Sequence, residues 1–416
     1  MASFKTRCAI AVLLAIATTS LLADALHYNN ILIGDRASGL AGAYTAISDD
    51  SSGLFYNPAG IVFTEDLQLS ASANAIHSTS STYKGALGGE DFERESSTIV
   101  PNFFGLSKKL GNGYIGFSYA VTDFVLEDQD SEITTIPGFP LVIININNTE
   151  KVTKLGPSYA LKLNEQWNLG ITLYLHNRER ELIQNQFIRL SNNTFESTNF
   201  YSTSSETGIE PVIGLMWTPD DSISFGLSVR QTKILSSSTD VQLTCISDVP
   251  GNPSPQCAQP SGTPLNPTLG SNDEKRELPL NTRFGVAYFP NPQLLFSADL
   301  SYYEAVDSSF SSAEEVLNIA IGTEYYFNAE WAIRGGYYTN NSNAPEIKPG
   351  QVNQSDHVDL DGFSISITRF SKTSSITIGY TASSGDGKAQ VIAGVPDIQD
   401  LEHTVETLYL STSYNF

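Results

Sequence analysis

The chain has 416 residues, of which 40% are hydrophobic, 10% aromatic and 16% charged, with a formal net charge of −22 and a mean hydropathy of −0.13. This acidic balance excludes a nucleic-acid binder, because such a protein needs a basic stripe that neutralises phosphates. Solubility of exposed acidic loops is sufficient to explain the charge. The many Tyr, Phe, Ser, Thr and Gly residues are typical of strands that face lipid on one side and a lumen on the other.

Residues 1–25 have the pattern of a secretory signal peptide. A basic start precedes an apolar run over residues 8–17, and residues 23–25 read Ala-Asp-Ala, a small-x-small cleavage site. The mature chain is therefore expected to begin at Leu26. No other apolar run approaches the roughly 20 residues that a membrane helix needs, so any membrane span must consist of strands. The alternatives are a secreted protein and an outer-membrane barrel.

Residues 26–65 are predicted to form a hatch that plugs a barrel. Segment 34–60 is rich in small residues and lacks period-2 alternation, and its spacing of Ala, Leu and Tyr fits one or two short helices. Small side chains allow close packing inside a lumen. We assign hatch and gating roles to the residues that punctuate the helices, which are Asp49, Asp50, Asn57, Pro58 and Ala59.

Residues 66–416 are predicted to form an all-β, fourteen-stranded antiparallel transmembrane β-barrel. The connections alternate strictly between tight turns and long polar loops, which is the rhythm of short periplasmic turns and long external loops. Fourteen strands leave a lumen that must be either open or plugged. The predicted strands cover residues 66–77, 96–109, 112–123, 151–163, 166–180, 205–218, 221–234, 278–290, 293–304, 315–328, 330–341, 357–370, 373–384 and 405–416.

The strand faces and the chain end support the barrel. Apolar residues at 223, 225, 227 and 229 alternate with Ser, Gly, Ser and Arg, and the strand 405–416 ends on Phe416. A terminal Phe after such a strand resembles the assembly signal of bacterial outer-membrane proteins. A soluble β-sandwich has similar alternation, but it does not predict the signal peptide, the even strand count, the loop asymmetry and the terminal Phe together.

Cys8 leaves with the signal peptide, so the mature chain keeps Cys245 and Cys257. An even pair of cysteines in an exported chain predicts one disulfide. Closing a loop of about 12 residues stabilises the fold by roughly 3 kcal/mol in the chain-entropy model. A metal or redox site is the weaker alternative.

Strand parity in segment 166–180 places Tyr174, Arg178 and Arg180 on the lumen side, opposite a lipid face that begins at Trp167. An arginine fork can bind a carboxylate with two parallel hydrogen bonds, so these arginines are candidate ligand contacts. The alternative is that they pair with carboxylates of the hatch, namely Asp35, Asp49 and Asp50. Arg334 carries the same two interpretations.

The connection between the third and fourth predicted strands, within residues 133–146, is too apolar for an ordinary exposed loop. Phe139, Leu141, Ile143 and Ile144 are its candidate ligand contacts, because an exposed apolar patch commonly marks a binding surface. The alternative is that the run belongs to a strand or packs into a small loop core.

Several segments resemble the FadL family of outer-membrane long-chain fatty acid transport porins. The Asn57-Pro58-Ala59 triplet matches the hatch, and Val100-Pro101-Asn102, Trp167, segment 319–327 with Trp331, and Arg334 look like corresponding family segments. In order and spacing they cover the mature chain. Two positions depart from the pattern: Glu314-Glu315 stand where a second basic anchor would align, and Phe124 stands where a glycine kink of the barrel wall would align.

The resemblance implies passive uptake of hydrophobic molecules, foremost long-chain fatty acids, across the outer membrane of a Gram-negative bacterium. In the family, ligand lands on an apolar external groove, moves to an inner pocket and leaves sideways through the barrel wall. We expect a monomer surrounded by outer-membrane lipid and lipopolysaccharide, with no cofactor. The alternatives are uptake of neutral aromatic or aliphatic hydrocarbons and a structural or adhesive barrel without transport.

An enzyme is not predicted. The chain has no Gly-x-Ser-x-Gly elbow, no Gly-x-Gly-x-x-Gly turn and no phosphate loop, and its five histidines have no metal-ligand spacing. Asp356, Asp359 and Asp361 faintly suggest a calcium loop, but His357 and Val358 break the required alternate spacing. We therefore expect no metal site.

Overall fold

The computed structural model describes residues 26–64, 67–250, 267–308, 312–391 and 395–416. The predicted signal peptide, residues 1–25, and Cys257 of the predicted disulfide lie outside these residues. Cys245 is buried, and the disulfide stays a prediction. Within the described residues, no helix is long and apolar enough to cross a membrane.

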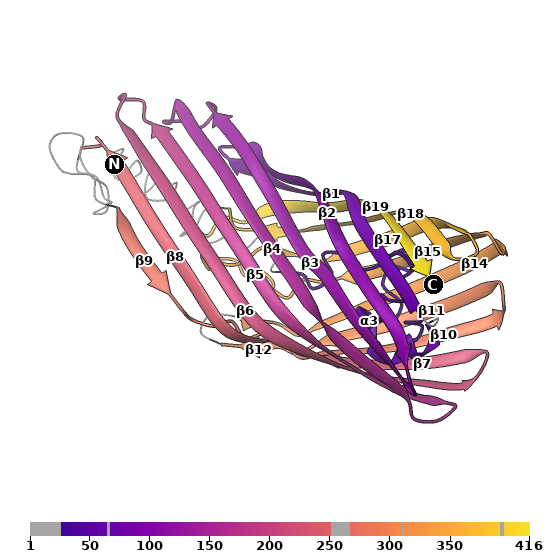
Figure 1. The fold of residues 1–416 in the computed structure, drawn as a ribbon. Coiled ribbons are helices and arrows are strands. Elements are labelled where there is room, and N and C mark those ends of the chain that lie inside the picture. Colours follow the sequence, from indigo (N-terminus) through magenta and orange to yellow (C-terminus); the bar gives the residue numbers. More distant parts are fainter. Residues whose placement is uncertain (1–25, 65–66, 251–266, 309–311, 392–394) are drawn as a thin grey trace.

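The chain forms a closed antiparallel barrel of fourteen strands, which confirms the predicted fold (Figure 1). Its strands pair in sequence order, β7 pairs with β10, and β1 pairs with β19 to close the ring. The barrel strands are β1 (Leu67–Leu87), β2 (Glu90–Leu110), β3 (Gly113–Ile133), β4 (Leu141–Lys162), β5 (Trp167–Arg189), β6 (Phe195–Asp220), β7 (Ile223–Arg230) continued by β8 (Lys233–Ser247), β10 (Asn281–Asn291), β11 (Leu294–Tyr303), β14 (Val316–Asn328), β15 (Trp331–Asn340), β17 (Leu360–Phe370), β18 (Ser374–Ala389) and β19 (Gln399–Asn415).

In the described part of the chain, four short strands lie outside the ring. Strand β9 (Thr268–Asn272) pairs with β8, strand β12 (Val306–Asp307) pairs with β13 (Ser312–Ala313), and β16 (His357–Val358) pairs with β18. Because both β7 and β8 pair with β6, they act as one barrel strand in two pieces.

The alternation of side chains along each strand shows which face points into the lumen and which faces lipid. On β5, Trp167, Leu169, Ile171, Leu173 and Leu175 are exposed on the outside, whereas the intervening residues from Asn168 to His176 are buried toward the lumen. A side-chain period of two lets one strand serve lipid on one face and the lumen on the other.

The barrel is taller on one side than on the other (Figure 1). Strands β1 to β6 have 21 to 26 residues, whereas β10, β11 and β15 have 10 or 11. The predicted bounds are therefore too short on the tall side, where the prediction ends the fifth strand at residue 180 but β5 continues to Arg189, whereas the predicted bounds of the short strands β10, β11, β14 and β15 agree within three residues. The lipid-facing apolar pattern stops before Asn177, while the ladders with β4 and β6 go on.

The hatch occupies the lumen near the short turns, where the indigo segment of Figure 1 lies inside the strands. It contains α2 (Asp35–Gly39), α3 (Gly53–Tyr56) and the 3₁₀ helix η2 (Pro58–Phe63). Its apolar side chains form an inner core with lumen-facing residues of the strands. This inner core includes Ile33, Leu40, Tyr44, Phe55 and Tyr56 of the hatch and Phe103, Val121, Tyr174 and Val212 of the wall.

A second apolar core lies at the long-loop end of the barrel, and we name it the outer cluster. It joins lumen-facing residues of β4 and β5 to the β1–β2 hairpin, to β16, β17 and β19, and to the loop after β18. Its members include Tyr83, Leu87, Phe92, Phe139, Val142, Ile144, Leu182, Ile188, Val358, Leu360, Val391 and Leu401. The lumen is thus filled at both ends by apolar packing.

Candidate functional site: a polar chamber beside a split in the wall

A polar chamber of about 210 Å³ lies between the inner core and the outer cluster. The order along β5 shows this layering. Tyr174 contacts the hatch, His176 and Arg178 line the chamber, and Leu182 belongs to the outer cluster. Five lining residues are basic and three are acidic: Lys154, Arg178, Arg230, Arg276 and Arg283 against Asp123, Glu150 and Glu210.

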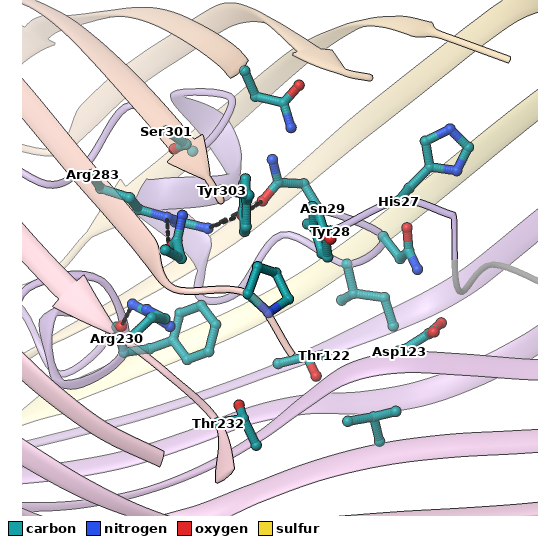
Figure 2. A pocket seen from close by; sticks show the side chains of 18 of the residues that line it. His27, Tyr28, Asn29, Thr122, Asp123, Arg230, Thr232, Arg283, Ser301 and Tyr303 are labelled. Atoms are coloured by element: carbon teal, nitrogen blue, oxygen red, sulfur yellow. Dashed lines mark hydrogen bonds between the residues drawn. The ribbon is translucent and has the colours of Figure 1, made fainter. Parts of the chain in front are cut away.

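The hydrogen bonds of Arg283 in the chamber go to uncharged groups. It donates to Asn281 at 3.3 Å, to Asn29 at 3.1 Å and to the Tyr303 hydroxyl at 3.2 Å. Tyr28 stacks on Tyr303 with ring centroids 4.1 Å apart. Figure 2 shows Arg283 turned toward Asn29, which the N-terminal segment carries into the chamber.

Arg230 stands beside Arg283 because β7 and β10 pair at Arg230 and Asn281. Its guanidinium lies 4.6 Å from the centroid of the Phe55 ring and donates to the Phe55 carbonyl. Its nearest carboxylate oxygen, on Glu210, is 3.7 Å away. Among the described residues, Arg283 forms no ion pair and Arg230 forms one only at 3.7 Å, so this pair is less closely neutralised than Arg178 or Arg276.

The predicted arginines Arg178 and Arg180 point into the lumen, but their carboxylate partners are wall residues. Arg178 lies 2.7 Å from Glu150 and 3.3 Å from Glu206, and Arg180 lies 3.4 Å from Glu150. Glu206 also pairs with Arg276 at 2.7 Å. The ion pairs run from strand to strand, and neither arginine pairs with Asp35, Asp49 or Asp50.

Arg334 belongs to the network that fixes the hatch. It pairs with Glu324, and Glu324 also accepts two hydrogen bonds from Arg36 of the hatch, at 2.7 and 2.9 Å. Arg36 in turn lies 2.6 Å from Asp49. Tyr174, another predicted ligand contact, is fully buried and donates to the Leu54 carbonyl of the hatch at 3.1 Å. Both residues therefore contact the hatch or its anchor rather than the open chamber.

The Asn57-Pro58-Ala59 triplet is seated on a pair of glycines. Asn57 caps η2 by accepting from the Ala59 amide, and its side chain donates to the carbonyls of Thr45 and Leu215 at 2.8 and 3.2 Å. A Cβ at Gly170 would stand 2.3 Å from the Pro58 carbonyl carbon, and one at Gly214 would stand 2.0 Å from Asn57 Oδ1. Only glycine lets β5 and β6 approach the hatch this closely.

Two predicted gating carboxylates stabilise the hatch from within. Asp49 accepts from Arg36 and from the Tyr44 hydroxyl, and Asp50 accepts from the Ser52 amide at 2.7 Å. Burial raises the pKa of Asp50 to about 6, and the neighbouring Asp35 and Asp49 add to the shift. Deprotonation of Asp50 therefore opposes the packed hatch.

The apolar run predicted as a loop is divided between a turn and β4. Phe139 lies in the turn and is buried, and Ile144 is buried on the lumen face of β4, so both pack in the outer cluster. Leu141 and Ile143 lie on the opposite face of β4 and are half-buried. The packed-core interpretation describes Phe139 and Ile144, and a ligand-landing role for any of the four residues stays a prediction.

The wall between β2 and β3 is split beside the chamber. Their ladder runs from Leu110–Gly113 to Phe103–Ala120, and the next pair is Ser96–Glu127. Within the described residues of both strands, no ladder pair joins residues 97–102 to residues 121–126, which at 3.3 Å per residue is an unpaired stretch about 20 Å long that we name the window.

A bulge and a proline accompany the split. Thr122 is an extra residue on β3, because Val121 pairs with Thr153 of β4 and Asp123 with the adjacent Val152. A bulge bends its strand and increases the local twist, and Pro101 of β2 cannot donate a ladder hydrogen bond. The predicted kink at Phe124 lacked its glycine, and the structure makes the bend two residues earlier without one. In Figure 2, Thr122 and Asp123 lie across the chamber from Arg230 and Arg283.

Sequence reasoning missed the anchoring potential of Arg230 and Arg283. The signal was present, since Arg230 stands on the polar face of the strand at 223–230 and Arg283 shares the buried face of β10 with Asn281. What sequence did not reveal is which lumen arginines have carboxylate partners. Within the described residues, no group of three or more His, Cys, Asp or Glu side chains is arranged to hold a metal ion.

Comparisons with known proteins identify the fold. No family model matches the chain. No curated protein matches it either. The toluene transporter TodX of Pseudomonas putida superposes with a TM-score of 0.68 at 14% identity, over 93% of this chain and 99% of that one.

Two further solved structures agree. A FadL homologue of Pseudomonas aeruginosa gives a TM-score of 0.65 at 14% identity, over 92% of this chain and 98% of that one. The toluene transporter TbuX of Ralstonia pickettii gives 0.64 at 12% identity, over 92% and 98%. At these identities the likeness is one of fold, and together with the closed barrel and its N-terminal hatch it confirms the FadL-like fold predicted from the sequence.

Proposed function

We propose that the protein is a monomeric outer-membrane transporter for passive uptake of hydrophobic small molecules, with no enzymatic activity. The observation that carries this proposal is a lumen chamber that the hatch bounds on one side and that adjoins an interrupted ladder in the lipid-facing wall. A hydrophobic ligand in such a chamber has a short path into the membrane. The solved structures of similar fold, described as hydrocarbon channels, toluene transporters and a FadL homologue, support the same class.

Long-chain fatty acids are the ligand that the chamber charges favour. The carboxylate would accept hydrogen bonds from Arg283 and Arg230, and the chain would lie against the apolar side chains of the hatch, such as Ile31 and Phe55. Charge-assisted hydrogen bonds of this kind are about twice as strong as neutral ones. This assignment moves the anchor from the predicted Arg178 and Arg180 to an arginine pair with weaker carboxylate engagement.

Neutral hydrocarbons are the second candidate. Structures of similar fold are described as toluene transporters and as monoaromatic hydrocarbon channels. A neutral ligand would use the apolar floor of the chamber and the same window, and it would not need the arginine pair. A structural or adhesive barrel, the third class, would show no flux of either ligand through liposomes.

Binding of a fatty acid and its methyl ester to Arg283→Gln separates the ligand classes. Because the hydrogen bonds of Arg283 go to uncharged groups, the substitution leaves no carboxylate without its hydrogen-bond donor. We expect acid binding to weaken by about 1.5 to 3 kcal/mol and ester binding to change little. Equal losses for the acid and the ester would reject the carboxylate anchor and favour neutral hydrocarbons, and proteoliposomes without flux of any of these ligands would reject transport.

A further inference from the structure

The split between β2 and β3 is closed at its outer end by one compact set of contacts, which we name the clasp. Arg94 of β2 and Glu127 of β3 form a bidentate ion pair, with Nε to Oε1 and Nη2 to Oε2 both at 2.7 Å. The Leu126 amide donates to the Ser96 hydroxyl at 2.9 Å. Among the described residues, Ser96–Glu127 is the one ladder pair between these strands on the outer side of Phe103–Ala120.

The ion pair of the clasp is buried, so separating its two charges is costly. The side chains of Arg94 and Glu127 are 10% and 3% exposed. Bidentate arginine–carboxylate contacts fix geometry as well as charge, and separating a desolvated pair would leave two uncompensated charges. Gln129 of β3 also bonds across the boundary between β2 and β3, which we call the seam: it donates to the Glu93 carbonyl at 3.2 Å and accepts from the Glu95 amide.

The clasp joins the β1–β2 hairpin to the wall that β3 forms with β4, two parts that also meet in the outer cluster. Glu127 accepts a hydrogen bond from Asn148 on β4 at 3.5 Å, and β3 is paired with β4 along its outer half. Glu127 therefore belongs to the wall that β3 forms with β4. Arg94 belongs to the β1–β2 hairpin, whose Tyr83 and Phe92 pack in the outer cluster. Among the described residues, the outer cluster holds the two parts together inside the lumen, and the clasp and the Gln129 bonds join the two strands themselves from the bulge to the rim.

Cavities lie behind the clasp and behind the window. A second cavity of about 70 Å³ is lined by Arg94, Ser96, Val125 and Glu127. The larger chamber reaches the window at Thr122 and Asp123. The contacts that close the seam are therefore next to the space through which a ligand would move.

We infer that the Arg94–Glu127 ion pair is a positioning element that keeps the β2–β3 seam closed and sets the rate at which ligand leaves through it. The inference rests on the lateral exit proposed above. It predicts that weakening the clasp changes the spacing of the seam and the release rate, while the equilibrium affinity of the chamber stays the same.

The test uses spin labels on the exposed residues Ile99 of β2 and Asp128 of β3, introduced as cysteines in a chain that also carries Cys245→Ser and Cys257→Ser. In the full-length protein, we expect Arg94→Gln to lengthen and broaden the distance between the labels. Release of preloaded fatty acid or toluene into liposomes should become several-fold faster. A double variant, Arg94→Met with Glu127→Leu, removes both charges of the pair and should behave in the same way.

Arg178→Gln is the matched control for the distance, because it breaks a buried ion pair across the β4–β5 ladder, which pairs on both sides of Arg178. It should leave the labels at their original spacing. An unchanged distance in both clasp variants would overturn the inference. A wider seam with an unchanged release rate would reject the lateral exit, and with it the rate-setting role of the clasp.

Discussion

The β5–β6 and β2–β3 seams have the same alternation of lumen-facing and lipid-facing side chains. The ladder of the β5–β6 seam is nevertheless complete, whereas that of the β2–β3 seam is interrupted. The β5–β6 ladder pairs every residue from Trp167–Trp217 to Arg189–Phe195. The β2–β3 ladder is continuous only from Leu110–Gly113 to Phe103–Ala120. The difference therefore does not come from hydrophobic patterning. The two seams differ in their surroundings: one lies against the hatch, and the other contains a bulge beside the chamber.

The closed seam lies directly against the hatch, and the split seam lies beside the chamber. Gly170 and Gly214 let the Asn57-Pro58-Ala59 segment lie directly on β5 and β6. On the other side, the extra Thr122 faces the chamber and the ladder is interrupted there. The hatch also bonds to other strands, through Arg36 to Glu324 of β14 and through Asp35 to Thr377 of β18, so it is fixed to the barrel independently of the split seam.

The largest expected effect comes from breaking the hatch contact on the closed seam with Gly214→Val. The new Cβ would stand 2.0 Å from Asn57 Oδ1 and 2.9 Å from Pro58 Cδ. Overpacking of this kind costs about 1 to 3 kcal/mol, and here the hatch must move to relieve it. We expect faster proteolysis of the hatch and a higher conductance in planar bilayers. Gly335→Val is the control, because a Cβ at Gly335 meets its nearest neighbour, the Ser364 carbonyl oxygen, only at 3.6 Å.

A smaller effect is expected from Asn57→Ala, which leaves the backbone of both strands unchanged. The substitution removes the η2 cap and the two hydrogen bonds to the carbonyls of Thr45 and Leu215. Loss of such a cap costs about 0.5 to 2 kcal/mol. Hydrogen exchange of the hatch amides should accelerate while the barrel stays resistant to heat and detergent. Unchanged exchange would mean that the triplet does not stabilise the hatch.

The smallest effect concerns the pH dependence of the hatch. The pKa of Asp50 is about 6 in the packed hatch and about 3.9 for a free aspartate. The packed state therefore holds the proton more tightly, and its stability falls as pH rises from about 4 to about 6 and is then constant. We expect a loss on the order of 1 kcal/mol after solvent screening. Asp50→Asn should reduce this slope, measured by hatch proteolysis at pH 4 and pH 7, and an unchanged slope would assign it to another group.

Sequence patterns predicted the barrel because lipid and lumen impose a period of two that single strands display. They predicted the hatch because its small residues lack that period. The strand ends were wrong beyond residue 180, since above the lipid band the outward residues of β5, such as Glu179 and Glu181, are polar and resemble a loop. Ladder pairing, which continues to Arg189, is not visible in one strand alone.

The site was only partly predictable for the same physical reason. Parity placed Arg178 and Arg180 in the lumen, but their partners Glu150 and Glu206 are supplied by neighbouring strands whose register a single sequence does not specify. The bulge at Thr122 was missed because a search for a kink looks for glycine. Register also decides which arginines keep uncharged partners, and it left Arg283 among Asn29, Asn281 and Tyr303.

Reversible cross-linking of the split seam tests the lateral exit most directly. Cysteines replace Ile99 and Leu126, both exposed on the outer face, in a chain with Cys245→Ser and Cys257→Ser, and a short cleavable thiol reagent bridges them. The matched control bridges Ile171 and Ile213, which face each other across the closed β5–β6 seam. We predict that the β2–β3 bridge stops uptake of hydrophobic ligand, that cleavage restores it, and that the control bridge has no effect. Undiminished uptake through a barrel bridged at Ile99 and Leu126 would contradict the lateral exit.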